Sequence, residues 1–177
     1  MASQIKVNEI IKQSGSSISI GESGDTINLA GSAYAAAGTN TPAFQAGLSS
    51  NQSITQNTSV KLNCDTELFD TDGTYDNSSN YRFTPAVAGK YYIYAVSRYT
   101  VSTDFDNFQL SIRKNGTDIL FMNRRHLHFG SQYIGGVVDS NATDYFEAFI
   151  YQDTGGAINA NGTTTMTYFG AYKLIGI

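Results

Sequence analysis

Charged residues and cysteine are both scarce in this sequence. Asp, Glu, Lys and Arg make up 15% of its 177 residues, against roughly 25% in an average soluble protein. Because 41% of the residues are hydrophobic, the low charge does not indicate disorder, which needs few apolar residues and high charge. Cys64 is the only cysteine, so no disulfide can form within the chain and a disulfide-stapled scaffold is excluded. Its alternating apolar surroundings predict that Cys64 is a buried hydrophobic residue.

The lack of a basic excess and of long apolar runs excludes further classes of protein. The formal net charge is −4, which repels a polyanion, so we expect no nucleic-acid binding. No apolar run approaches the ~18 residues of a membrane-spanning helix, so we expect no membrane insertion. Residues 1–6 lack a basic region followed by an apolar segment, and we therefore expect no signal peptide.

The residues that are plentiful favour β-structure. The chain has 12 Tyr and 10 Phe, which suit half-buried pleated strands. From residue 41 onward, short apolar-alternating stretches recur with turn residues between them, a pattern typical of a sandwich or barrel. Phe108, Leu110 and Ile112 alternate and run into Asn115-Gly116, a pair that favours a two-residue hairpin turn. The sequence thus predicts an all-β domain over residues 41–177.

Residues 1–40 have a different pattern. Residues 14–20 and 23–29 both read Ser-Gly-x-x-apolar-x-apolar, which predicts a glycine turn followed by a strand with one apolar face. Two such units cannot bury that face alone, because repeats need about three neighbours, so copies from other chains could supply the rest. Residues 33–40 read as a linker. We therefore predict an N-terminal stalk or anchor with linker over residues 1–40.

Three stretches carry apolar or aromatic residues on both faces of the expected strand: residues 90–96, 145–151 and 166–175. A sandwich strand needs only one buried face, so a second copy of the chain is the simplest cover for the other. The alternative is that tyrosines tolerate exposure. The predicted interface residues are Tyr91, Tyr92, Tyr94, Phe146, Phe149, Tyr151, Tyr168, Phe169 and Tyr172.

Motifs for catalysis are missing from the sequence. It contains no Gly-x-Ser-x-Gly elbow, no His-Glu-x-x-His and no phosphate-binding loop with Lys-Ser/Thr. A Ser-His-Asp arrangement formed in space stays open, but the chain has only two histidines. We expect no catalytic residues and no enzyme activity.

Two groups of residues superficially resemble metal sites, although we expect no cofactor. Asp70, Asp72 and Asp76 resemble part of a calcium loop but lack its full set of ligands, and turn-forming Asp and Gly explain them without metal. His126 and His128 point the same way if they lie on a strand. On the three-fold axis of a trimer they could bind a transition metal, whereas a solvated strand or loop needs no metal.

Several motifs resemble the jelly roll of the complement and tumour-necrosis-factor family. Residues 83–93 resemble its Phe-x5-Gly-x-Tyr-x-Phe signature, with Ile93 in place of the last Phe. Residues 110–116 resemble the strand that ends in Lys-Asn-Gly, and residues 168–174 resemble the closing strand. The matched motifs cover about residues 67–175. The resemblance implies a jelly-roll β-sandwich and a homotrimer in which aromatic sheet faces pack around the three-fold axis.

The N-terminal stretch resembles the leader of tailed-bacteriophage virion proteins. Residues 5–10 and the two Ser-Gly units carry this resemblance, and residues 170–177 are similar to the closing segment of such proteins. The resemblance implies a virion location, assembly in the cytoplasm of the bacterial host, a stalk that binds other virion proteins, and a C-terminal knob at residues 41–177. In the knob, binding of a cell-surface glycan or protein is expected at exposed loops. The candidate residues are Tyr75, Phe105, Arg124 and Tyr133.

These observations favour a non-enzymatic structural protein of a bacteriophage virion, a trimeric tail fibre or spike whose knob attaches to the host. One alternative is a head decoration or cement protein that stabilises the capsid shell. Another is a secreted, complement-like adhesive lectin, which the missing signal peptide disfavours.

Overall fold

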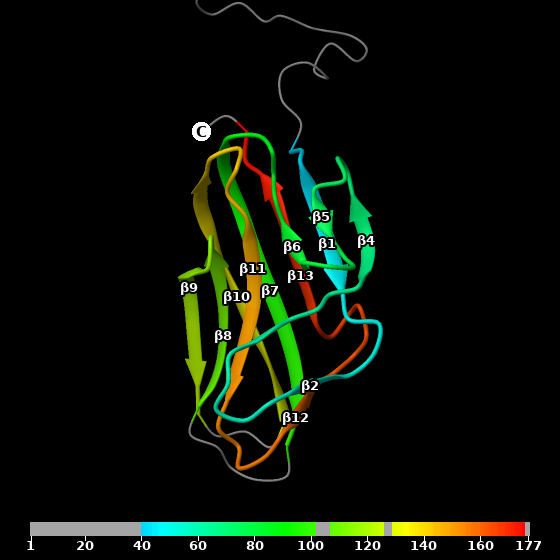
Figure 1. Cartoon of the computed structure of the whole chain (residues 1–177), viewed down its shortest axis with the longest axis vertical. Coiled ribbons are helices and arrows are strands. Elements are labelled where there is room, and N and C mark those ends of the chain that lie inside the picture. The colour runs from blue at the N-terminus through cyan, green and yellow to red at the C-terminus, as the bar shows by residue number, and fades with distance from the viewer. Residues whose placement is uncertain (1–39, 102–106, 126–128, 176–177) are drawn as a thin grey trace, which may run out of the picture. The chain divides into compact units, whose positions relative to one another are not determined.

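The computed structural model describes residues 40–101, 107–125 and 129–175. The chain divides into two units, Met1–Ala37 and Gly38–Ile177, and all described residues belong to the second (Figure 1). Within the described residues every regular element is a β-strand, and no helix there is long and apolar enough to cross a membrane. The predictions for the stalk, for Phe105 and for His126 and His128 fall on residues outside these ranges.

The first sheet has seven antiparallel strands built around the long central strand β7. On one edge β7 pairs with β10 over its whole length; on the other it pairs with β13 and, further along, with β12. The order continues from β13 through β1 to β4, and from β12 to β2. The strands are β1 (Ala43–Gly47), β2 (Gln52–Ile54), β4 (Thr66–Asp70), β7 (Gly89–Thr100), β10 (Phe129–Ser140), β12 (Ile158–Ala160) and β13 (Tyr168–Lys173).

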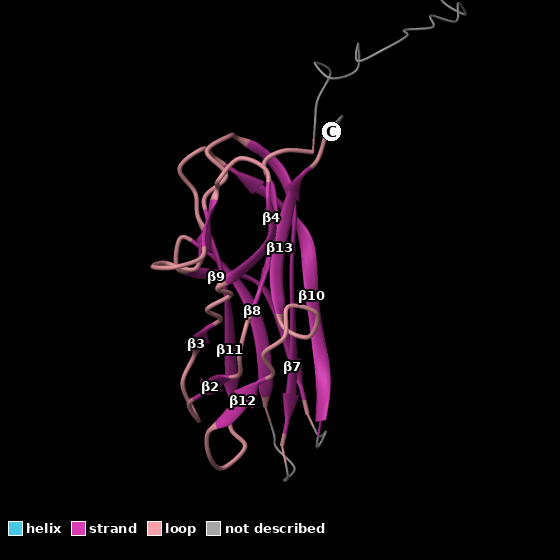
Figure 2. Cartoon of the chain, turned by 90° about the vertical axis from the view of Figure 1, so that its right-hand side faces the viewer, coloured by secondary structure: helices cyan, strands magenta, loops and turns pink. Residues whose placement is uncertain are grey.

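The second sheet has six strands in the order β5-β6-β11-β8-β9, with β3 also paired to β11. The view in Figure 2 separates the two layers, with β3, β9 and β11 on one side and β7, β10 and β13 on the other. The predicted all-β sandwich is thereby confirmed. The strands are β3 (Val60–Lys61), β5 (Tyr75–Asp76), β6 (Arg82–Phe83), β8 (Phe108–Lys114), β9 (Thr117–Arg124) and β11 (Phe146–Gln152).

The side chains of β7 alternate between the core and the outer side of the first sheet, as the period of a strand requires. One set is buried between the two sheets, and the intervening set is exposed or partly exposed. Every second position therefore contributes to the hydrophobic core. The buried set comprises Tyr91, Ile93, Ala95, Ser97 and Tyr99.

Aromatic rings from both sheets form the centre of one half of the core. Phe44 is fully buried and stacks on Tyr75 at 4.5 Å and on Phe83 at 4.7 Å, with Phe169 edge-on at 5.1 Å. The Tyr75 hydroxyl donates to the backbone carbonyl of Cys64. Cys64 is also fully buried, as predicted, and burial raises the pKa of its thiol to about 12, so the thiol is neutral and inert.

The predicted hairpin turn joins β8 to β9. Asn115 and Gly116 have φ values of 51° and 84°, the left-handed conformation that a type I′ turn requires at both central residues. The Asn115 amide nitrogen Nδ2 donates to Oδ1 of Asp144 at 2.7 Å. Asp144 also accepts from the backbone N–H of Asn141 and pairs with Lys114 at 2.8 Å. One carboxylate therefore ties the hairpin to the chain that enters β11.

These contacts predict a pH dependence of stability. The Lys114 side chain and the two amide donors hold the pKa of Asp144 at about 2, below the value near 4 of an unfolded aspartate. Because the folded pKa is the lower one, this stabilisation is fully present above about pH 4 and is lost as the pH falls towards 2. The Asp144→Asn variant should be less stable than wild type at pH 6, and the difference in urea midpoint should shrink between pH 4 and pH 2.

Asp139→Asn is the matched control, because Asp139 pairs with Lys90 while 80% of its side chain is exposed. An exposed pair contributes little, so this variant should track wild type at every pH. A difference between Asp144→Asn and wild type that stays constant down to pH 2 would contradict the assigned role of the carboxylate.

Candidate functional site

The outer side of the first sheet carries a cluster of tyrosines, which we name the tyrosine face. The positions that alternate with the core residues of β7 and β13 bring four of them to this side, and β10 supplies the fifth. The members are Tyr92, Tyr94, Tyr133, Tyr168 and Tyr172.

Two glycines shape the tyrosine face by letting rings lie flat on the sheet. Gly135, Tyr94, Gly170 and Gln45 are successive partners across β10, β7, β13 and β1. The Tyr94 ring lies across Gly170, where an added Cβ would come within 2.5 Å of it. The ring thereby reaches the next strand, and its hydroxyl donates to Oε1 of Gln45 at 2.8 Å. Gly170 and Gln45 together fix the orientation of Tyr94.

The remaining rings pack around Tyr94. Tyr92 lies 5.6 Å from Tyr172, and Tyr94 lies 6.2 Å from Tyr168 between ring centroids. The hydroxyls of Tyr92 and Tyr133 share a hydrogen bond, and an added Cβ at Gly135 would meet both of them. The result is a preorganised aromatic surface whose polar groups are largely paired within the surface itself.

Two phenols of the tyrosine face have raised pKa values. Burial and the neighbouring Tyr168 and Tyr172 raise the pKa of Tyr94 to about 12, and the hydrogen bond with Tyr92 raises the pKa of Tyr133 to about 12. An uncharged phenol suits contact with another protein surface, because its ring is apolar and its hydroxyl tolerates water.

A second exposed apolar surface, which we name the edge surface, lies where β9 and β10 form neighbouring edges of the two sheets. Its exposed member is Met122 on β9, which is 42% exposed. Val137 on β10 is 54% exposed, but it is the cross-strand partner of Tyr92 and therefore lies on the side of the tyrosine face. Leu120 points inward at this edge and fills the space above Gly136, where an added Cβ would clash with its side chain. Exposed apolar residues along a sheet edge invite contact with another chain.

The structure separates the nine predicted interface residues into three groups. Tyr92, Tyr94, Tyr168 and Tyr172 lie on the tyrosine face. The prediction is wrong for Tyr91, Phe146 and Phe169. These three side chains are buried in the core between the sheets, where no second chain can reach them.

The third group, Phe149 and Tyr151, lies on the outer side of the second sheet. The Arg113 guanidinium stacks on the Phe149 ring at 3.9 Å, and the Tyr151 hydroxyl donates to Oδ1 of Asn57 at 3.2 Å. Intramolecular partners therefore cover these two rings in part, and they do not extend the tyrosine face.

The predicted ligand-binding residues do not form one site. Tyr75 is a core residue, 5% exposed and stacked on Phe44, so its predicted role in a surface loop is wrong. Arg124 is exposed at the end of β9, where it donates to the carbonyl of Ser131 at 3.0 Å. Tyr133 lies on strand β10 rather than in a loop and belongs to the tyrosine face. Residues 131–137 show no regular alternation of apolar and polar residues, so the sequence pattern did not place Tyr133 on a strand.

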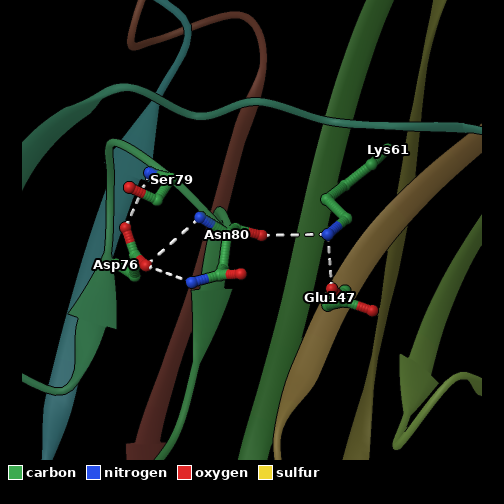
Figure 3. A network of polar contacts seen from close by, with 5 residues as sticks. All are labelled: Lys61, Asp76, Ser79, Asn80 and Glu147. Carbon is green, nitrogen blue, oxygen red and sulfur yellow. Dashed lines mark hydrogen bonds and ion pairs between the residues drawn. The ribbon is translucent and has the colours of Figure 1, made fainter.

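The aspartates of the loop that resembles a calcium site serve their own turns. Asp70 accepts from the backbone N–H groups of Asp72 and Tyr75. Asp76 accepts from Ser79 and Asn80, as Figure 3 shows, and these hydrogen bonds hold its pKa below the usual range.

Lys61 on β3 joins the same turn to strand β11 of the second sheet. The Lys61 ammonium donates to the Asn80 carbonyl and to Glu147, whose Oε1 lies 2.5 Å away (Figure 3). In the described part of the chain, no three His, Cys, Asp or Glu side chains gather so that they could hold a metal ion.

Comparison with known proteins identifies the class of fold. No family model and no curated protein matches the sequence. Solved structures do match: Eiger TNF from S. frugiperda has 12% identity and a TM-score of 0.57, covering 76% of this chain and 93% of that one. Murine APRIL at pH 8.0 has 12% identity and a TM-score of 0.59, covering 75% of this chain and 98% of that one.

At this level of identity the likeness defines the fold. The described domain is a jelly-roll β-sandwich of the tumour-necrosis-factor type, as the motifs in residues 67–175 predicted.

Proposed function

We propose that this chain is a non-enzymatic structural component of a bacteriophage virion. In this proposal it forms a homotrimeric fibre or spike, assembled in the cytoplasm of the bacterial host. The stalk binds other virion proteins and the C-terminal knob binds the host surface. The resemblance of residues 5–29 to phage virion leaders supports the virion role, and the fold of the knob supports a protein that works by assembly and binding.

The tyrosine face is the observation that carries the assembly part of the proposal. A monomer would leave this neutral aromatic surface, together with the 54%-exposed Val137, in water. The edge surface and the tyrosine face lie on different strands and sides of the domain, so contact between the two is heterologous, and such contacts close into a ring when the rotation between copies allows it. A ring of three copies follows from the trimeric assembly implied by the sequence resemblance.

A trimer also suits weak recognition of a cell surface. Three knobs on one fibre, with many fibres on one particle, multiply a weak single contact by raising the effective concentration of the next. Host attachment of this kind needs only one modest binding site on each knob.

The proposal is tested by locating the protein and measuring its attachment. Immunogold labelling of particles should place it on the tail, and fluorescent full-length trimer should bind permissive host cells saturably. A monomeric variant should bind at least about tenfold more weakly, because avidity is lost. Regular labelling of the capsid lattice, with shells that weaken when the gene is deleted and no cell binding, would instead identify a decoration protein.

A further inference from the structure

A hollow of about 370 Å3 opens at the edge of the sandwich where the first sheet ends in β2 and β4. We name it the polar hollow. Its walls come from the β1–β2 connection and the first residues of β2, from the segment before β4 and from the residue before β6. It is part of neither the tyrosine face nor the edge surface, and β10 is at the opposite edge of the sheet. The lining residues are Leu48, Ser50, Asn51, Gln52, Ser53, Asn63, Asp65 and Tyr81.

Hydrogen bonds within the loops fix the walls of the polar hollow. Asp65 accepts from the Ser49 backbone N–H at 2.8 Å and from its hydroxyl at 2.6 Å. The Gln52 side chain donates to the Lys61 carbonyl at 2.7 Å and accepts from the Asn63 backbone N–H at 2.9 Å. These contacts hold the β1–β2 connection against the segment before β4, so the shape exists before any ligand arrives.

A third loop locks the same wall. The backbone N–H of Gly162 donates to Oδ1 of Asn51 at 2.7 Å. Gly162 lies so close to the β1–β2 connection that an added Cβ would come within 1.8 Å of the backbone carbonyl carbon of Ser50. The amide of Asn51 is thereby oriented, with its NH2 group left for other partners.

Several polar groups of the polar hollow keep unused hydrogen-bonding capacity. Across residues 40–101, 107–125 and 129–175, no hydrogen bond uses Nδ2 of Asn51, the side-chain amide of Asn63 or the hydroxyl of Tyr81. The Asp65 carboxylate retains free lone pairs. Burial opposes its ionisation, but the hydrogen bonds that it accepts, those from Ser49 foremost, together keep its pKa below the ordinary value.

The chemistry of the lining selects the class of ligand. No Lys, Arg or His lines the polar hollow, so phosphate, sulfate and carboxylate ligands would meet Asp65 without a counter-charge. An apolar ligand would leave the amides and the carboxylate unpaired, which is costly. A neutral sugar fits both conditions, because its hydroxyls pair with amides and a carboxylate and its C–H face packs on an aromatic ring such as that of Tyr81.

We propose that the polar hollow binds a neutral sugar unit of a cell-surface glycan, with Asn63 and Asp65 pairing its hydroxyls and Tyr81 supporting its ring. This inference rests on the proposed function, in which the knob contacts the host surface, and it replaces the scattered residues Arg124 and Tyr133 with one built site. The single contact is weak, as an avid trimer allows.

The test uses the full-length protein with glucose, galactose, mannose and N-acetylglucosamine at millimolar concentration, observed by saturation-transfer difference NMR. At least one of these sugars should receive saturation, whereas the anionic N-acetylneuraminic acid should not. Asn63→Ala should weaken binding by about three- to tenfold, the usual effect of one hydrogen bond. Tyr81→Asn should weaken it at least as much; asparagine is chosen because Tyr81 has a φ of 49°, which asparagine tolerates.

Asn159→Ala is the matched control, because Asn159 lines a separate hollow of about 390 Å3 beside Thr154 and Gly155. It should bind the sugar like wild type, and thermal unfolding of all variants checks that they fold. Transfer to none of the four sugars, equal transfer in wild type and both hollow variants, or equal binding of N-acetylneuraminic acid would overturn the site. Trimer mass and host-cell binding are measured on the same samples. A wild-type protein that neither forms a trimer nor binds host cells would overturn the proposed function. A wild-type protein that binds cells but none of the sugars would overturn the sugar site in the polar hollow alone.

Discussion

Replacing Tyr172 with glutamate should convert the assembled protein into a monomer. Tyr172 lies on the tyrosine face with its ring 5.6 Å from that of Tyr92, and in the proposed trimer a neighbouring chain covers it. Glutamate would remove the ring and bury a charge without a partner, and a central interface tyrosine alone contributes about 2 kcal/mol or more. Repeated at three identical contacts, this loss exceeds what a modest interface can tolerate.

Multi-angle light scattering at micromolar concentration measures the result directly. Wild type should have three times the mass of the 19.2 kDa chain, and Tyr172→Glu should have the mass of one chain. Tyr151→Glu is the control, because Tyr151 is a partly exposed tyrosine on the other sheet and should leave the trimer intact. A monomeric wild type, or a trimeric Tyr172→Glu, would show that the tyrosine face is not an interface.

Replacing Phe44 with alanine should be the most destabilising single truncation in the core. Phe44 is fully buried and contacts three rings from three other strands: Tyr75, Phe83 and Phe169. Its loss leaves a cavity among rigid rings that cannot collapse, and Phe→Ala changes of this kind cost about 3–5 kcal/mol. Urea unfolding at a fixed protein concentration, as an assembled protein requires, should show a lower midpoint with an unchanged slope.

Phe121 provides the matched control for this prediction. It is the same residue type, but it is 57% exposed on the edge strand β9, so truncation removes little buried area. Phe121→Ala should lower the free energy of unfolding by less than about 1 kcal/mol. Equal losses in the two variants would contradict the packing described for Phe44.

Local patterns in the sequence predicted much of the fold because their causes are local. The left-handed conformation of Asn115 and Gly116 is a property of those two residue types, and the alternation of Phe108, Leu110 and Ile112 reports the period of a strand with one buried face. The burial of Cys64 followed from the same kind of alternation in the stretch around that residue. Each of these predictions is confirmed by the structure.

The two-sided aromatic strands were recognised, but the side that faces the core was not. In Tyr91-Tyr92 both residues have the same chemistry, so the sequence pattern cannot say which is inside; Tyr91 is in the core and Tyr92 is on the tyrosine face. Tyr75 failed for a related reason. A short strand between turns looks like a surface loop until Phe44, 31 positions earlier, is seen to stack on it.

The amino-acid sequence was sufficient for the class of fold, the strand-rich composition, the hairpin and the surplus of aromatic residues, since all of these depend on residue type and spacing along the chain. The tertiary structure assigned each tyrosine to a side, placed Gly135 and Gly170 beside Tyr94, and brought Asn51, Asn63 and Tyr81 around one hollow. These features depend on register between strands and on contacts between distant segments, which no local pattern encodes.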